Sequence, residues 1–174
     1  MEKNLNLYII IKTFILIPLF FGILGLICTG IICCIFLPYG KVIATRLYEL
    51  FAIIGIKLIG IKINLSGEHL VNKNQSYVVV SNHPSTIDIF THIHILPVSI
   101  RFLTKAELFK IPIFGSALKI LGLPKVDRRK ATKKEINKSV EEVIDNNNSI
   151  MVFAEGTRTD SDKDLLPFKK GAAW

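Results

Sequence analysis

The chain has 174 residues, of which 50% are hydrophobic and 21% are charged, and its formal net charge is +8. This length allows one domain of ordinary size, and the composition excludes a disordered chain, a coiled coil and a collagen-like repeat. The apolar residues are unevenly distributed, because Thr13–Gly40 contains no charged residue whereas charges interrupt every stretch after Lys41. The composition therefore predicts a membrane segment followed by a soluble domain.

Residues 1–61 are predicted to form a membrane-anchoring or docking segment. The apolar stretch Leu7–Pro38 is longer than the roughly 18 residues that cross a bilayer as a helix, and it is too long for the apolar core of a secretory signal. A second stretch, Leu47–Ile61, contains Glu49 and Lys57, which suits an interfacial helix or the return limb of a half-inserted hairpin. We expect an uncleaved N-terminal membrane helix or helical hairpin.

Residues 62–174 alternate between strand and helix patterns. Tyr77–Ser81 has the composition of a continuous buried strand, and Ala131–Asp145 has the apolar spacing of an amphipathic helix. This alternation predicts an α/β domain with a mixed, largely parallel sheet flanked by helices. The further expected elements are strands at Lys62–Leu65, Ile100–Leu103 and Ile150–Ala154, an extended stretch ending at Val126, and helices at Thr86–Leu96 and Ile113–Leu121.

A basic stripe lies between Lys119 and Lys134, in which Asp127 alone is acidic. Such a stripe serves nucleic acid, anionic lipid or a phosphorylated substrate, or is simply a solvated face. Zinc-ligand spacing, RNA-binding aromatic motifs and helix-turn-helix patterns do not accompany it, so the sequence argues against a nucleic-acid partner. The cations of the stripe are Lys119, Lys125, Arg128, Arg129, Lys130, Lys133 and Lys134.

The first chemical motif is the run Ser81–Asp88, placed where a strand is expected to end and a helix to begin. Residues five apart on a regular helix point about 140° away from each other, so His83 and Asp88 cannot pair if both are helical. Pro84 favours the first helical position and places His83 in the turn before the helix, which permits the pairing. Asp88 would then fix one imidazole nitrogen and leave the other as a base. The alternative is a capping turn with an ordinary histidine.

Two further clusters follow the expected strands. The second runs from Lys105 through Gly115 and ends at Val126-Asp127-Arg128, and the third is Phe153-Ala-Glu-Gly-Thr-Arg158. In the third cluster Gly156 permits a close backbone approach, and Arg158 offers a fork of donors that matches phosphate. Its alternative interpretation is a surface turn with a salt bridge. His92 and His94 could suggest a metal site, but a pair with this spacing in an apolar helix more often packs or reaches solvent.

The order His-x4-Asp, Lys-x-Glu-Leu-x3-Pro-x2-Gly with Val-Asp-Arg, and Phe-x-Glu-Gly-Thr-Arg resembles the glycerolipid acyltransferase family over about residues 45–174. Within the family the closest resemblance is to bacterial 1-acyl-sn-glycerol-3-phosphate acyltransferases. The resemblance implies that His83 is the general base and that Asp88 orients it. It also implies two groups of substrate-binding residues. Those linked to binding of the acceptor or the acyl donor are Lys105, Glu107, Pro112 and Arg128. Those linked to binding of glycerol phosphate are Glu155, Gly156, Thr157 and Arg158, with Arg158 on the phosphate.

The resemblance implies transfer of a fatty acyl chain from acyl-CoA or acyl-carrier protein to the sn-2 hydroxyl of 1-acylglycerol 3-phosphate (lysophosphatidate), giving phosphatidate. A thioester already has a good leaving group, so a base, an orienting carboxylate and phosphate-holding cations suffice without metal or cofactor. The implied partners are the membrane lipid, the acyl donor and the bilayer. The implied location is the bacterial cytoplasmic membrane, with the catalytic domain facing the cytoplasm.

Two alternatives to this function remain at this stage. One is a different lyso-lipid acceptor, because the motifs do not fix the head group or the acyl length. The other is an inactive, truncated membrane fragment of the family. Family members continue beyond the Lys-Gly that follows the third motif, whereas this sequence ends at Gly171–Trp174, so we expect an incomplete C-terminus and an exposed edge strand. A hydrolase is disfavoured, because the sequence contains no Gly-x-Ser-x-Gly elbow.

Overall fold

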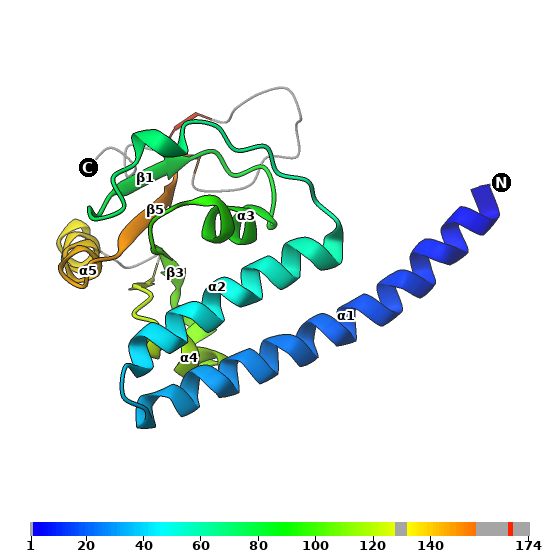
Figure 1. Cartoon of the computed structure of the whole chain (residues 1–174), viewed down its shortest axis with the longest axis horizontal. Coiled ribbons are helices and arrows are strands. Elements are labelled where there is room, and N and C mark those ends of the chain that lie inside the picture. The colour runs from blue at the N-terminus through cyan, green and yellow to red at the C-terminus, as the bar shows by residue number, and fades with distance from the viewer. Residues whose placement is uncertain (1, 128–131, 156–166, 169–174) are drawn as a thin grey trace.

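The chain folds into a helical hairpin laid against an α/β unit (Figure 1). The structure, a computed structural model, describes residues 2–127, 132–155 and 167–168, with side chains from Lys12 onward. The hairpin consists of α1 (Glu2–Cys33), the short 3-10 helix η1 (Cys34–Phe36) and α2 (Gly40–Ile59). The N-terminal half of α1 extends beyond the end of α2 and away from the α/β unit (Figure 1).

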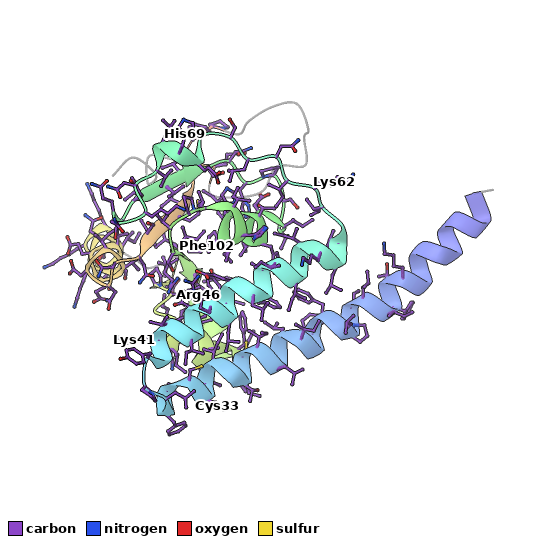
Figure 2. All side chains as sticks on the ribbon, viewed as in Figure 1. Cys33, Lys41, Arg46, Lys62, His69 and Phe102 are labelled. Carbon is purple, nitrogen blue, oxygen red and sulfur yellow. The ribbon has the colours of Figure 1, made fainter. Side chains whose placement is uncertain are left out.

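The hairpin is held by close packing at its turn and along its inner face. Cys33 and Lys41 flank the turn, and Lys62 follows the opposite end of α2 (Figure 2). A side chain at Gly40 would collide with the carbonyl oxygen of Cys34, so this turn requires glycine. Buried residues of α1, η1, α2 and the end of the later helix α4 (Phe114–Ile120) form one core cluster, which comprises Cys28, Ile31, Cys34, Ala44, Ala117 and Leu121.

The predicted N-terminal apolar helix is present. Within α1 and η1, the 25-residue segment Lys12–Phe36 is long and apolar enough to cross a membrane by length and composition. Its outer face is unpaired in the structure, since Phe14 and Leu26 are each 76% exposed. Apolar exposure of this extent is unusual for a helix that only supports a soluble core.

Helix α2 belongs to the core of the α/β unit as well as to the hairpin. It lies between α1 and α3 (Asp88–Ile95), and its Ala52 is fully buried in a cluster with Ile93 of α3 and Met151 of the sheet. A Cβ at Gly55 would lie 2.8 Å from Cδ1 of Phe90, so the glycine lets α3 approach α2 closely. The predicted return limb at Leu47–Ile61 is thus a helix that covers one face of the sheet.

The sheet has three described strands in the order β1-β5-β2, and both pairings are parallel. The strands are β1 (Val78–Ser81), β2 (Ile100–Phe102) and β5 (Ser149–Phe153), and α3 connects β1 to β2. The central strand β5 is buried over its first three residues, with Ile150 and Met151 at 0% and 1% exposure. A parallel sheet flanked by helices confirms the predicted α/β class.

A second, two-stranded parallel sheet pairs β3 (Thr104–Lys105) with β4 (Lys125–Val126). The 3-10 helix η3 (Ala106–Lys110) and α4 (Phe114–Ile120) lie between these strands in the chain, and α5 (Lys133–Asp145) leads from β4 to β5. Helix α5 begins with a capping box, in which Thr132 Oγ1 accepts from the backbone N–H of Glu135. A further short 3-10 helix, η2 (Glu68–Leu70), follows α2.

Two details of the strand prediction are wrong. Lys62–Leu65 is not a strand but part of an irregular connection, because no described strand lies beside it to complete a ladder. Tyr77–Ser81 is not buried on both faces, since Val78 and Val80 are 56% and 51% exposed. A run of consecutive valines predicts a central strand, but β1 lies at the edge of the described sheet. The two-residue strand β3 was too short to show a periodic pattern.

The buried side chain of Arg101 ties the hairpin to the α/β unit. Arg101 lies on β2 and is only 3% exposed. Its Nε donates to the carbonyl oxygen of Leu121 at 2.6 Å, and its Nη2 donates to Thr45 Oγ1 of α2 at 3.1 Å. The guanidinium also lies over the ring of Tyr48, 5.6 Å from its centroid. Burial lowers the pKa of Arg101. Its contacts join three elements, namely β2, α2 and the residue that follows α4.

We expect Arg101→Met to lower the free energy of unfolding by about 1–3 kcal/mol, because the buried carbonyl at the end of α4 and the partly buried hydroxyl of Thr45 lose their donor. Urea unfolding in detergent micelles measures this change. The matched control is Arg46→Met on α2 (Figure 2), whose side chain is 77% exposed and pairs with Glu49. The control should cost less than about 1 kcal/mol, and equal losses in the two variants would contradict the assignment.

Candidate active site

His83 and Asp88 meet in the loop between β1 and α3, as the spacing of the first motif predicts. The strand ends at Ser81 and the helix begins at Asp88, so His83 is in the loop and Asp88 is in the first helical turn. The imidazole Nδ1 lies 2.9 Å from Asp88 Oδ2. The side chains of His83 and Asp88 are only 16% and 15% exposed, so the pair is largely shielded from water while still reachable.

The Asp88 carboxylate is held by the backbone as well as by the imidazole. The N–H of Ser85 donates to the same oxygen, Oδ2, at 2.8 Å. An ionised carboxylate only accepts hydrogen bonds, so His83 carries its proton on Nδ1 and donates it to Asp88. In the neutral imidazole this leaves Nε2 without a proton and able to accept one. The geometry therefore supplies an oriented base.

Phe153 fixes the plane of the imidazole. The rings of His83 and Phe153 are stacked, with centroids 3.8 Å apart and an interplanar angle of 10°. Phe153 is the last residue of β5, and the parallel register places it opposite Ser81 at the end of β1. The hydrogen bond to Asp88 acts in the plane of the imidazole and the stacking acts on its face, so the two contacts together restrict its rotation. The sequence patterns did not predict that Phe153 would stack on the imidazole.

Glu155 joins the third motif to the first. Its side chain is 1% exposed, and Oε1 accepts from the backbone N–H of His83 at 3.2 Å. A buried carboxylate that accepts from a loop amide stabilises that loop in one conformation. The structure thus brings His83, Asp88 and Glu155 together, although 72 residues of chain separate His83 from Glu155.

The second motif forms a neighbouring but separate arrangement. Lys105 ends β3 opposite Val126 of β4, which places the two halves of the motif side by side. Lys105 Nζ lies 3.6 Å from Glu107 Oε1, and both side chains are 60% exposed. In the described part of the chain, no hydrogen bond or ion pair joins this exposed pair to His83 or Asp88.

Pro112 shapes the turn that precedes α4. Its carbonyl oxygen accepts from the N–H of Phe114 at 2.6 Å, and the intervening Ile113 has a φ of 64°. A non-glycine residue at positive φ is strained and persists only where its surroundings impose it. Gly115 is required here, because a side chain would collide with the backbone of Phe109. The Pro-x-x-Gly spacing therefore encodes a tight turn.

The remaining predicted site residues, Arg128, Gly156, Thr157 and Arg158, lie outside the described residues. A cavity of about 790 Å³ lies at the amino-terminal ends of β2 and β5, where Ser99 and Asn148 contribute to its wall. None of the described candidate site residues lines this cavity. Ligands of parallel sheets usually bind at the carboxyl ends of the strands, which is where His83, Lys105 and Glu155 lie.

A substitution at Glu155 should reveal how much the loop depends on the buried carboxylate. Glu155→Gln keeps an oxygen that accepts from His83 N–H, whereas Glu155→Leu leaves that amide without this acceptor. We expect the leucine variant to be less stable than the glutamine variant by about 1–3 kcal/mol. Urea unfolding in matched detergent provides the measurement, and equal stability of the two variants would refute the importance of this contact.

Comparison with known proteins identifies the family. The acyltransferase family model matches residues 62–174. The 1-acyl-sn-glycerol-3-phosphate acyltransferase of Saccharomyces cerevisiae is 35% identical over 118 residues, which cover 66% of this chain and 39% of that protein. The Helicobacter pylori enzyme of the same name is 36% identical over 96 residues, which cover 55% of this chain and 40% of that protein. The chain thus spans well under two thirds of these relatives.

A solved structure supports the fold. The crystal structure of the 1-acyl-sn-glycerophosphate acyltransferase PlsC from Thermotoga maritima superposes with a TM-score of 0.72 at 23% identity. The match covers 99% of this chain and 69% of that one, and therefore includes the hairpin as well as the sheet. Together with the family model and the relatives, it confirms the resemblance that the three motifs predict: the chain belongs to the acyltransferase family.

Proposed function

We propose that this chain transfers a fatty acyl group from a thioester donor to the sn-2 hydroxyl of 1-acylglycerol 3-phosphate, giving phosphatidate. The observation that carries the proposal is the His83–Asp88 hydrogen bond of 2.9 Å at the carboxyl end of β1. Relatives from yeast and Helicobacter pylori bear the name of this activity. Acyl-CoA and acyl-carrier protein are both suitable donors, since each presents the acyl group as a thioester.

His83 is the general base in this proposal. Its Nε2 accepts the proton of the acceptor hydroxyl while the hydroxyl oxygen attacks the thioester carbonyl carbon. The new C–O ester bond forms, the C–S bond breaks, and the imidazolium returns the proton to the departing thiolate. Asp88 stabilises the imidazolium and keeps the productive nitrogen directed outward. The thiolate is a good leaving group, so a base and correct positioning of the two substrates account for the reaction.

The phosphate of the acceptor requires cations near the oriented base. From the family resemblance we assign Arg158 to the phosphate, with Gly156 and Thr157 in the same binding segment. Lys105 and Arg128 extend the basic surface for acceptor or donor, and Glu107 and Pro112 shape it. Glu155 is the exception in its motif, because its buried carboxylate contacts the backbone of His83. We therefore assign Glu155 to support of the loop that carries the base.

Residues 1–61 are proposed to anchor the enzyme to the membrane, and residues 62–174 to form the acyltransferase domain. The support is the exposed apolar surface of α1, in the segment Lys12–Phe36. Lysophosphatidate and phosphatidate are bilayer lipids, so an anchored enzyme avoids extracting an acyl chain into water at about 0.8 kcal/mol per CH₂. We place the enzyme at the bacterial cytoplasmic membrane with its catalytic domain on the cytoplasmic side, where both donors are made.

Transfer of radiolabelled acyl groups on membranes that contain the chain tests the proposal. We expect His83→Ala and Asp88→Asn each to lower the rate by about 10²–10⁴, because one removes the base and the other removes the charge that orients it. His69→Ala is the control, since His69 is an exposed histidine on η2 (Figure 2). A His83→Ala variant that keeps a tenth or more of the wild-type rate would contradict the assignment.

The same assay resolves substrate choice. Lysophosphatidate is compared with lyso-lipids that carry other head groups, and acyl-CoA with acyl-carrier protein. Activity with another acceptor alone would replace lysophosphatidate in the proposal without changing the role of His83. Failure of the wild-type chain with every acceptor would overturn the enzymatic proposal.

Membrane anchoring is tested with a chain that starts at Leu24. This chain lacks most of α1, including Phe20, whose ring packs on Phe51 of α2. It keeps Leu24, Cys28 and Ile31, which belong to the core cluster with α2 and α4. We expect the full chain to stay in membranes washed with carbonate, and the shortened chain to be released while it retains its circular dichroism spectrum. Release of the full chain by carbonate would contradict an integral anchor, and release by high salt alone would indicate binding through the basic stripe.

A further inference from the structure

A second imidazole, that of His92, contacts both ends of the loop between β1 and α3 that carries His83. His92 is on α3, one helical turn after Asp88, and its Nδ1 lies 2.6 Å from the backbone carbonyl oxygen of Asp88. Its Nε2 lies 3.0 Å from Ser81 Oγ, at the end of β1. The side chain of His92 therefore contacts both ends of the segment that carries His83.

The partners of His92 determine its tautomer. A carbonyl oxygen only accepts hydrogen bonds, so Nδ1 must carry the proton that is donated to Asp88 O. In the neutral ring Nε2 is then an acceptor, and the hydroxyl of Ser81 donates to it at 3.0 Å in preference to Asn82 Oδ1, which lies 3.4 Å away. Both ring nitrogens are thus satisfied within the protein. With both nitrogens occupied, His92 has no lone pair free to act as a base on substrate.

His92 also contacts Phe153, the ring on which the His83 imidazole is stacked. The rings of His92 and Phe153 meet edge to face, with centroids 5.9 Å apart and an interplanar angle of 80°. Phe153 is stacked on His83 on one side and on Phe102 on another. His92 therefore contacts Asp88 through the backbone and His83 through Phe153, the two neighbours that orient the base.

We propose that His92 is a positioning residue of the acyl-transfer site, which ties the end of β1 to the start of α3 and thereby holds His83 and Asp88 at the separation that catalysis needs. This inference rests on the proposed function for its kinetic consequence. A displacement of about 1 Å at a reacting group costs on the order of 10²-fold in rate. Loss of the two hydrogen bonds of His92 should therefore lower kcat measurably. Ordinary packing of a core histidine would change stability without this selective effect.

The test compares substitutions at His92 with a matched control on the same helix. His92→Leu loses both hydrogen bonds, whereas His92→Asn and His92→Gln each retain an amide near one of the two ring nitrogens. His94→Leu is the control, because His94 is exposed two residues further along α3. We expect kcat per folded molecule to fall about 10–100-fold in His92→Leu and less in the amide variants, with the KM for lysophosphatidate within about threefold of wild type.

A spectroscopic measurement separates this inference from the proposed function. In the full chain labelled with ¹⁵N-histidine in detergent micelles, His83 and His92 should both give the signals of Nδ1-protonated rings. The His83 signal should shift or broaden in His92→Leu and stay unchanged in His94→Leu. This readout needs no substrate, so it holds even if the wild-type chain transfers no acyl group to lysophosphatidate.

The outcomes are distinct. A shifted His83 signal together with lost kcat supports the positioning role, and a shifted signal in a chain without acyltransferase activity supports it while refuting the proposed reaction. An unchanged His83 signal in folded His92→Leu, His92→Asn and His92→Gln would overturn the inference. Equal losses of kcat in His92→Leu and His94→Leu would overturn it as well. If the leucine variant does not fold, the two amide variants decide the question.

Discussion

The parallel pairing of β1 with β5 is the constraint on which the site depends. It places Ser81 opposite Phe153, so that the segments after the two strands leave the sheet together. His83 comes from one segment and Glu155 from the other, and a hydrogen bond of 3.2 Å joins them. A slip of one residue would turn Phe153 to the opposite face of the sheet and remove the surface on which the imidazole rests. The orientation of the His83 imidazole therefore depends on the sheet as much as on the loop.

The hairpin is bound to this sheet through α2, which has two functions at once. One face of α2 packs on α1, and another covers α3 and the sheet through Ala52 and Gly55. Arg101 adds a polar connection, since its guanidinium joins β2 to Thr45 of α2 and to the end of α4. Removal of the whole hairpin would therefore uncover the core of the α/β unit. The hairpin and the α/β unit that bears the candidate site therefore share a core around α2.

Local patterns in the sequence predicted most of the helices and strands. The apolar spacing of Ala131–Asp145 gave α5 directly, and Pro84 correctly separated His83 from the helix that carries Asp88. The errors arose where the environment of a segment depends on distant neighbours. Lys62–Leu65 alternates like a strand but has no described partner, and the valines of β1 lie at a sheet edge. The contacts of Phe153, Glu155 and His92 require the strand register, which no local pattern in one sequence reveals.

The central position of β5 also has a consequence for the order in which the protein can be built. During synthesis the hairpin emerges before the sheet, whereas Ser149–Phe153, the strand that must lie between β1 and β2, emerges after all the other described strands and helices. Until β5 is available, β1 and β2 have no described neighbour to pair with, and the inner face of α2 has no sheet to cover. The nascent chain thus exposes a long apolar helix well before its domain can close. The helix that we propose as the membrane anchor can therefore reach a lipid surface before the acyltransferase domain closes behind it.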